Sequence, residues 1–180
     1  MSHQVKTMFG SVPRDLAAFV DQSQIYQAEA VKYWVEMFRS RKGRTWGVMW
    51  WNLRDGWPII SDGVVDYYYN RKRAYDAIKS VQGDQLVLLD DAHRLVAGND
   101  ALAPVSGTVT ATDAASGKVV FSGACEIPAN GKVTLTETLP LSRQGMLKIV
   151  YTFGGSPRVN HTLYGEPPFD YSSYLEWRRK

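Results

Sequence analysis

The hydrophobic residues of this chain follow one period before residue 83 and another after it. From residue 22 to residue 40, apolar side chains recur every three or four positions, which predicts a helix with one buried stripe. Residues 74–81 repeat this period over a shorter stretch and predict a second helix that ends at Gly83. From about residue 85 the period falls to two, which is typical of half-buried antiparallel strands. We therefore expect an α part followed by a β part.

The β part spans residues 83–164 and contains about seven candidate strands. Turn-forming stretches at residues 113–117 and 128–131 separate some of them. This number of short strands is typical of an immunoglobulin-like sandwich, and we predict that fold here. Residues 165–180 carry four aromatic side chains, and disordered segments are poor in aromatics. We expect this tail to dock on the folded body.

An apolar run that begins at Gly47 turns abruptly polar after two Trp residues. Its sequence, Gly-Val-Met-Trp-Trp-Asn-Leu-Arg-Asp-Gly-Trp-Pro, is typical of a buried parallel strand whose carboxyl end reaches a binding cleft. Three indole rings, with an amide, a guanidinium and a carboxylate among them, suit a ligand that is polar at its rim and apolar on its faces. Sugars are the commonest ligands of this kind.

Strand alternation predicts which of these indoles faces the cleft. Gly47, Met49 and Trp51 share one side of the predicted strand, whereas Trp50 takes the opposite side. The alternative is that all three Trp side chains belong to a core, because aromatic residues dominate cores generally. In that case Asp55 and the Gly that follows it are ordinary turn residues.

The run from Gly47 to Pro58 resembles the last barrel strand and the following loop of glycoside hydrolase family 2, especially its β-mannosidase-like branch. Residues 23–30 are similar to the helix before that strand. Residues 64–68, with Lys72, Ala74 and Tyr75, are similar to the approach to the last barrel helix. The resemblance covers residues 4–82. It departs from the usual pattern at Asn52, where the family often has Gln, and at Arg54, where it often has Asn.

The resemblance implies a retaining glycosidase built on an eight-stranded α/β barrel. Such enzymes use two Glu carboxylates about 5 to 5.5 Å apart, one as the nucleophile and one as the general acid/base. In the family both Glu residues precede the segment that begins here, and a barrel of this kind needs about 250 residues. The resemblance thus implies that the chain lacks the catalytic pair and is inactive alone, although its parent is an enzyme acting on β-linked sugars.

The predicted fold class is therefore an α+β fragment. Residues 1–82 are expected to be the last helix-strand-helix of a (β/α)8 barrel, residues 83–164 an immunoglobulin-like sandwich, and residues 165–180 an aromatic tail. No catalytic residue is expected in this chain. The candidate substrate-binding residues are Trp51, Asn52, Asp55 and Trp57, with Trp51 as the aromatic floor under the sugar.

Composition excludes several other kinds of site. The chain has 180 residues and a net charge of +3, and its basic residues gather at helix ends and at the terminus, so we expect no nucleic-acid partner. A single cysteine, Cys125, allows no intramolecular disulfide and no cysteine-based metal site. His3, His93 and His161 lack ligand spacing, and we expect no metal and no cofactor.

Nothing in the sequence is long and apolar enough to span a bilayer, so we expect no membrane partner. The first residues have no apolar signal-peptide core, but the resemblance places any export signal upstream, which leaves the compartment open. The expected partners are a carbohydrate substrate and the upstream part of the same polypeptide.

Two other functions remain open at this stage. The first is a noncatalytic carbohydrate-binding or protein-docking module centred on the β part. It would need an exposed aromatic platform, yet residues 85–164 contain no Trp. The second is a structural β-sandwich that supports a barrel. The sequence favours a glycosidase for the parent chain and a structural role for residues 85–164.

Overall fold

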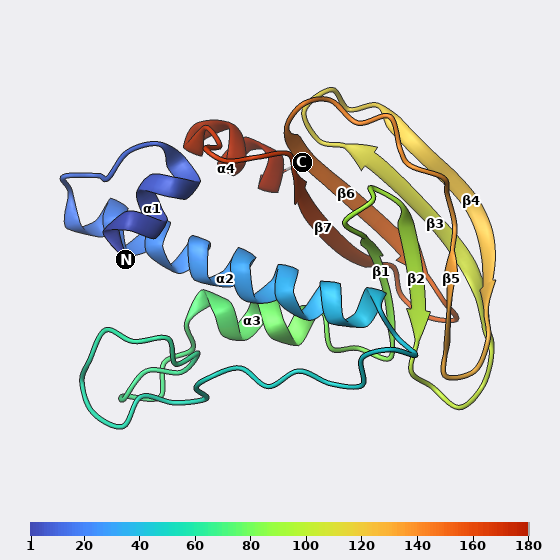
Figure 1. Ribbon diagram of the computed structural model, residues 1–180, viewed down its shortest axis with the longest axis horizontal. Coiled ribbons are helices and arrows are strands. Elements are labelled where there is room, and N and C mark those ends of the chain that lie inside the picture. The colour runs from blue at the N-terminus through green and yellow to red at the C-terminus, as the bar shows by residue number, and fades with distance from the viewer. Residues whose placement is uncertain (180) are drawn as a thin grey trace.

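The computed structural model describes residues 1–179 and shows a helical part beside a β part (Figure 1). Within these residues the helices are α1 (Ser2–Phe9), α2 (Leu16–Ser40), α3 (Arg73–Ser80) and α4 (Tyr171–Arg179). The strands are β1 (Gln85–Leu89), β2 (Leu95–Asn99), β3 (Val105–Asp113), β4 (Val119–Ile127), β5 (Gly131–Thr134), β6 (Gly145–Thr152) and β7 (Arg158–Tyr164). The predicted change from α to β near residue 83 is confirmed.

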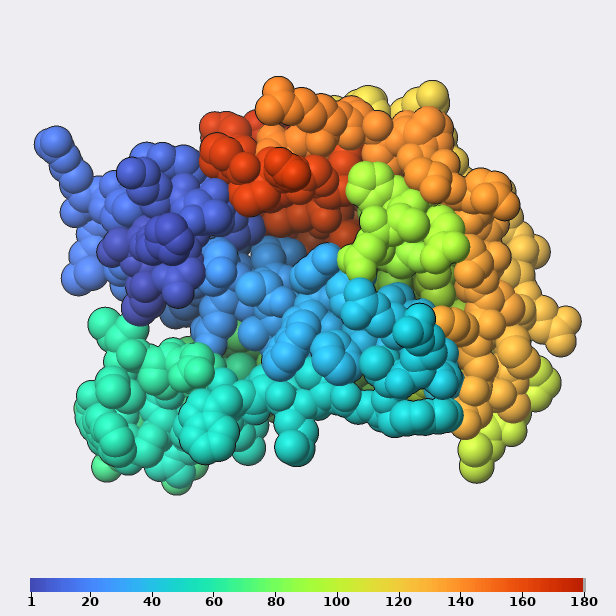
Figure 2. All heavy atoms as spheres, in the orientation of Figure 1, coloured from blue at the N-terminus to red at the C-terminus, as the bar shows by residue number. Residues whose placement is uncertain are grey.

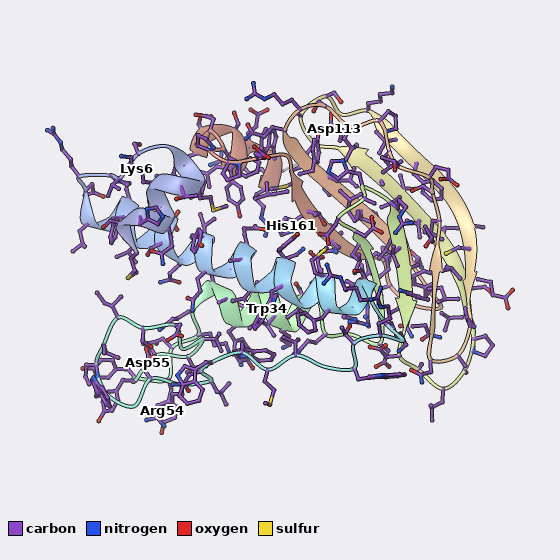
Figure 3. All side chains as sticks on the ribbon, viewed as in Figure 1. Lys6, Trp34, Arg54, Asp55, Asp113 and His161 are labelled. Atoms are coloured by element: carbon purple, nitrogen blue, oxygen red, sulfur yellow. The ribbon has the colours of Figure 1, made fainter. Side chains whose placement is uncertain are left out.

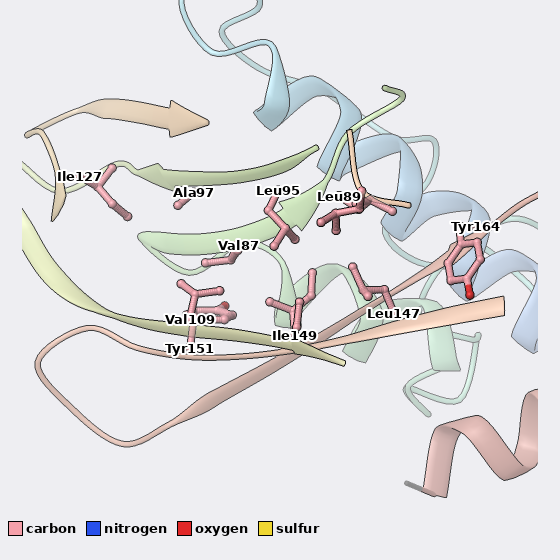
Figure 4. Packing of buried hydrophobic residues seen from close by; sticks show 12 residues of the cluster. Val87, Leu89, Leu95, Ala97, Val109, Ile127, Leu147, Ile149, Tyr151 and Tyr164 are labelled. Carbon is pink, nitrogen blue, oxygen red and sulfur yellow. The ribbon is translucent and has the colours of Figure 1, made fainter. Parts of the chain in front are cut away.

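The strands of residues 1–179 form two antiparallel sheets, one in the order β1-β2-β5 and the other in the order β4-β3-β6-β7. Alternate residues of facing strands point inward, as the period of two predicts. The buried side chains between the sheets include Val87, Leu95, Val109, Ile149 and Tyr151 (Figure 4). Burial of these two apolar faces against each other is the main source of stability in this part.

Helix α2 is longer at its N-terminus than the hydrophobic stripe predicts. The stripe begins at residue 22, whereas the helix begins at Leu16. Asp15 is the N-cap, and its carboxylate accepts a hydrogen bond from the backbone N–H of Ala18 at 2.8 Å. Such a cap satisfies one of the free N–H groups of the first turn and stabilises a helix start that hydrophobicity does not mark.

The predicted strand over residues 47–52 does not form, and this part of the fold prediction is wrong for the chain as it stands. Within the described chain, no strand pairs with these residues. They run as an irregular segment along the helical part (Figure 1). A parallel barrel strand is held by hydrogen bonds to a neighbour on each side. Here the described strands pair only within the two sheets, which leaves the segment without a partner.

The C-terminal tail packs on the helical part. Phe169 and Tyr174 are buried in one apolar cluster with Val5 and Met8 of α1 and Ile25 of α2. Figure 1 shows α4 lying between α1 and the end of the four-stranded sheet. Lys180, the last residue of the predicted tail, lies outside the described residues. None of the helices in residues 1–179 combines the length and the apolar character that a membrane span requires.

Candidate functional site

The segment that follows α2 keeps the alternation predicted for a strand, although it has no strand partner. Trp50 packs against a buried cluster that contains Val64 and Ile78. Its neighbours point away from the protein, with 91% of Met49 and 82% of Trp51 exposed. The segment lies on the surface beside α2 in Figure 2. The structure therefore separates the two adjacent indoles, one against the helices and the other toward open space.

Asn52 begins the loop, and backbone hydrogen bonds hold this start in place. The N–H of Val64 donates to the carbonyl oxygen of Asn52 at 3.2 Å, and the N–H of Val65 donates to that of Leu53 at 2.9 Å. The N–H of Asp55 donates in turn to the carbonyl oxygen of Val65 at 3.0 Å. These bonds bring residues 52–55 and 64–65 together and fix the position from which the site side chains project.

Asp55 lies inside the loop, with only 2% of the residue exposed. Its carboxylate accepts a hydrogen bond from Lys72 Nζ at 2.8 Å and another from the hydroxyl of Ser61. Burial acts to raise the pKa of Asp55, but the bonds from Lys72 and Ser61 outweigh it and hold the pKa below its usual value. Asp55 is therefore an ionised anchor that joins the loop to the start of α3.

This geometry is that of a residue that orients the loop, and a contact of Asp55 with substrate stays a prediction. Its side chain is fully buried, and each carboxylate oxygen already accepts one hydrogen bond from within the loop or from Lys72. Figure 3 shows Asp55 within the loop beside Arg54. Sequence reasoning missed Lys72 and Ser61 as its partners because the contact depends on how the intervening loop folds back. The residue Asp55 positions the loop that carries the other candidates.

Trp57 and Asn52 are more accessible. Trp57 is 64% exposed at the far end of the loop, and Asn52 is half-buried. A cavity of about 550 Å³ lies next to the loop, between α1, α2 and residues 59–62. Neither Trp51 nor Trp57 is among its lining residues. In the described residues, Trp51 and Trp57 thus lie on an open surface outside this cavity.

Arg54 is held by a tyrosine that follows in the same loop. Its guanidinium carbon lies 3.9 Å from the ring centroid of Tyr69, and Nη1 donates to the Tyr69 hydroxyl at 2.6 Å. The ring of Tyr67 lies 5.9 Å away. Stacking of a guanidinium on aromatic faces orients the charge without neutralising it. The run of three Tyr residues was visible in the sequence, but their role in orienting Arg54 was not.

The two glutamates of α2, half-buried Glu29 and buried Glu36, take part in contacts between structural elements. Glu29 accepts hydrogen bonds from His161 of β7 and Tyr174 of α4, and Glu36 pairs with Lys32 at 2.7 Å. Glu29 thus contacts the sandwich and the tail, and Glu36 also accepts a hydrogen bond from the side chain of Asn160 on β7. Both carboxylates are therefore hydrogen-bonded to side chains of other structural elements. Among residues 1–179, no group of three or more His, Cys, Asp or Glu side chains is arranged to hold a metal ion.

Comparison with known proteins adds an independent finding. No protein-family model matches the chain. Beta-mannosidase B of Aspergillus niger is 34% identical over 70 residues, a match that covers 37% of this chain and 8% of that protein. Beta-mannosidase B of Emericella nidulans is 33% identical over 70 residues, with the same shares covered. The matched stretch is thus a small part of these relatives.

Solved structures share the fold over almost the whole chain. The β-D-mannosidase from Dictyoglomus thermophilum superposes with a TM-score of 0.82 and 24% identity, covering 94% of this chain and 22% of that one. The exo-chitosanase CsxA from Amycolatopsis orientalis superposes with a TM-score of 0.71 and 20% identity, covering 91% of this chain and 21% of that one. The chain thus spans about a fifth of the length of these proteins.

The relatives and the structural neighbours are glycoside hydrolases. Within that class, the chain is similar to the C-terminal part of a family 2 enzyme of the β-mannosidase-like branch, and this confirms the resemblance carried by residues 47–58.

Proposed function

We propose that this chain is the C-terminal part of a retaining glycoside hydrolase that acts on β-linked sugars. In the whole protein, residues 1–82 complete a (β/α)8 barrel, with residues 47–52 as its last strand, and residues 83–164 form an immunoglobulin-like sandwich beside it. The opposed environments of Trp50 and Trp51 are the observation that carries this proposal. In a barrel, one face of each strand meets the surrounding helices and the other faces the lumen.

The unpartnered segment supports the same proposal. No backbone hydrogen bond joins residues 46–51 to any other part of the described chain. A barrel strand between two neighbours would satisfy these groups on both sides. The solved β-mannosidase is several times longer than this chain, which leaves ample length for the other strands.

In the proposed enzyme, Trp51 is the floor of the subsite that holds the cleaved sugar. A flat indole covers the apolar face of a pyranose and leaves the sugar hydroxyls free for hydrogen bonds. Asn52 and Trp57 complete the contact from the loop, and Asp55 keeps that loop in place. The two catalytic Glu residues belong to the upstream part of the polypeptide. Residues 83–164 act as a structural support.

The proposal is tested by two substitutions in the chain joined to its upstream reading frame. Trp51→Ala should lower kcat/KM for p-nitrophenyl β-D-mannoside by about 100-fold, because about 2 to 3 kcal/mol of binding in the transition state is lost. Trp50→Ala, the matched control, should change kcat/KM far less and lower the melting temperature instead. A Trp51→Ala enzyme with normal kcat/KM would remove Trp51 from the site. A chain that binds sugar but has no upstream Glu pair would support the noncatalytic module.

A further inference from the structure

His161 on β7 contacts two helices that lie on either side of it. Its Nε2 atom lies 2.8 Å from Oε1 of Glu29 on α2, and its Nδ1 atom lies 2.6 Å from Nη1 of Arg178 on α4. The residue is labelled in Figure 3 between α2 and β7. A single imidazole ring therefore joins the sandwich to the long helix and to the C-terminal helix.

The donors and acceptors around the ring fix its protonation state. A guanidinium can only donate, so Nδ1 of His161 must accept the bond from Arg178 and carry no proton. The proton is then on Nε2, which donates to the carboxylate of Glu29. The observed arrangement requires a neutral imidazole.

Other charged groups surround the ring. From α2, Lys32 Nζ donates to the backbone carbonyl oxygen of His161 at 2.5 Å and pairs with Glu36. From α4, the hydroxyl of Tyr174 donates to the same oxygen of Glu29 at 2.6 Å. On β6, Lys148 is the register partner of His161. The carboxylate of Glu29 therefore favours a positive charge on the ring, whereas the nearby cations oppose it.

Protonation of His161 would affect its two contacts in opposite directions. A proton on Nδ1 would face the N–H groups of Arg178, so two donors and two positive charges would meet at hydrogen-bond distance. The bond from Nε2 to Glu29 would instead become an ion pair and grow stronger. Acid should therefore break one contact of the ring and keep the other.

We propose that α4 is an acid-released strap, in which protonation of His161 expels Arg178 and frees the last turn of α4 while the contact of Glu29 with His161 keeps α2 and β7 joined. The start of the tail stays in place because Phe169 and Tyr174 are buried against α1. The strap does not depend on the glycosidase proposal, since its contacts all lie between residues of this chain.

The pKa shifts of His161 and Glu29 agree with a proposal in which His161 is protonated while Glu29 is still ionised. The pKa of His161 is lowered to about 4, and burial is the largest cause of this shift. The charges of Lys32 and Arg178 also lower the pKa, whereas the hydrogen bond to Glu29 acts to raise it. Burial acts to raise the pKa of Glu29, but His161 and Lys32 outweigh it and lower that pKa to about 2. Glu29 is thus still ionised when His161 takes up its proton.

An NMR titration of the chain from pH 7 to pH 3.5 tests the strap directly. The ring nitrogens of His161, assigned with a His161→Gln variant, report its protonation, and the amides of residues 177–179 report the last turn of α4. We expect the signals of the ring nitrogens and those of the amides to change with one shared midpoint near pH 4. Amide protection in that turn should fall by about tenfold or more, while β7 and α2 stay protected.

Arg178→Gln supplies the decisive variant, with Arg179→Gln as its matched control on the same turn. Arg178→Gln should raise the midpoint of His161 and uncouple the last turn from it, whereas Arg179→Gln should retain both responses. Three results would each overturn the proposal. The first is that the amide signals of the last turn do not change as His161 titrates, and the second is that His161 titrates in the Arg178→Gln variant as it does in the parent chain. The third is that the amides of β7 and α2 lose protection at the same midpoint.

Discussion

At the scale of single residues, the adjacent side chains of Trp50 and Trp51 should contribute unequally to stability. Trp50 packs against buried residues of α3, whereas Trp51 is 82% exposed. In the isolated chain, Trp50→Ala should lower the free energy of unfolding by up to about 3 kcal/mol, because a partly buried indole is lost. Trp51→Ala should change it by less than about 0.5 kcal/mol. Urea unfolding of both variants makes the comparison, and equal losses would contradict the assigned orientations.

Stability should also depend on pH through His161. Its pKa is lowered to about 4 in the folded chain, below the ordinary value of 6.5, so the unfolded chain binds more protons between these values. The free energy of unfolding should therefore fall as pH drops from about 6.5 to about 4, by about 3 kcal/mol in all. His161→Gln should flatten this part of the curve. Urea unfolding at a series of pH values measures how the free energy of unfolding depends on pH. If His161→Gln had the same pH dependence as the parent chain, other groups would be its cause.

At the scale of elements, the ion pair of Asp55 and Lys72 joins the candidate loop to α3. Lys72→Met leaves a buried carboxylate without its partner and should destabilise the chain by about 3 kcal/mol. The exposed Lys79 on the same helix provides the control, since Lys79→Met should be nearly neutral. Hydrogen exchange should show the loss concentrated in residues 53–65. If Lys72→Met increased hydrogen exchange equally across the whole chain, the ion pair of Asp55 and Lys72 would not be what holds the loop.

The sequence was sufficient to predict elements whose determinants are local. The period of two identified the β part, and the stripe of α2 identified most of that helix. The strand over residues 47–52 failed because a strand needs a hydrogen-bonded neighbour, and within the described residues no strand pairs with this segment. Alternation nevertheless predicted that Trp50 and Trp51 lie on opposite sides of the segment, as the structure shows. That Trp51 faces a sugar cleft stays a prediction.

Contacts between distant residues could not be predicted. Glu29 and His161 are separated by most of the chain, and nothing near either residue indicates that they meet. Lys72 was visible in the sequence as part of the resemblance, but its bond to Asp55 depends on the folded loop. The sequence therefore named the candidate residues but not their contacts, and the substrate contacts of Trp51, Asn52 and Trp57 stay predictions.

At the scale of the whole molecule, the two parts should differ in stability. Residues 85–164 enclose a core between two sheets, whereas the segment from residue 46 to residue 60 exposes many large apolar side chains. Limited proteolysis of the monomeric chain should therefore cut within residues 41–72 first and leave the sandwich intact. Early cuts between β3 and β7 with a protected segment 41–72 would contradict this order.

We propose that this chain supplies the floor and the loop of a glycosidase site, and that the catalytic carboxylates belong to the upstream part of the polypeptide. The most direct measurement is the hydrolysis of p-nitrophenyl β-D-mannoside by the chain alone and by the chain joined to its upstream reading frame. We predict no turnover above the buffer blank for the chain alone and ready turnover for the joined protein, because positioning without an acid and a nucleophile leaves the glycosidic bond intact. Turnover by the chain alone that survives repurification, or an inactive joined protein, would contradict the claim.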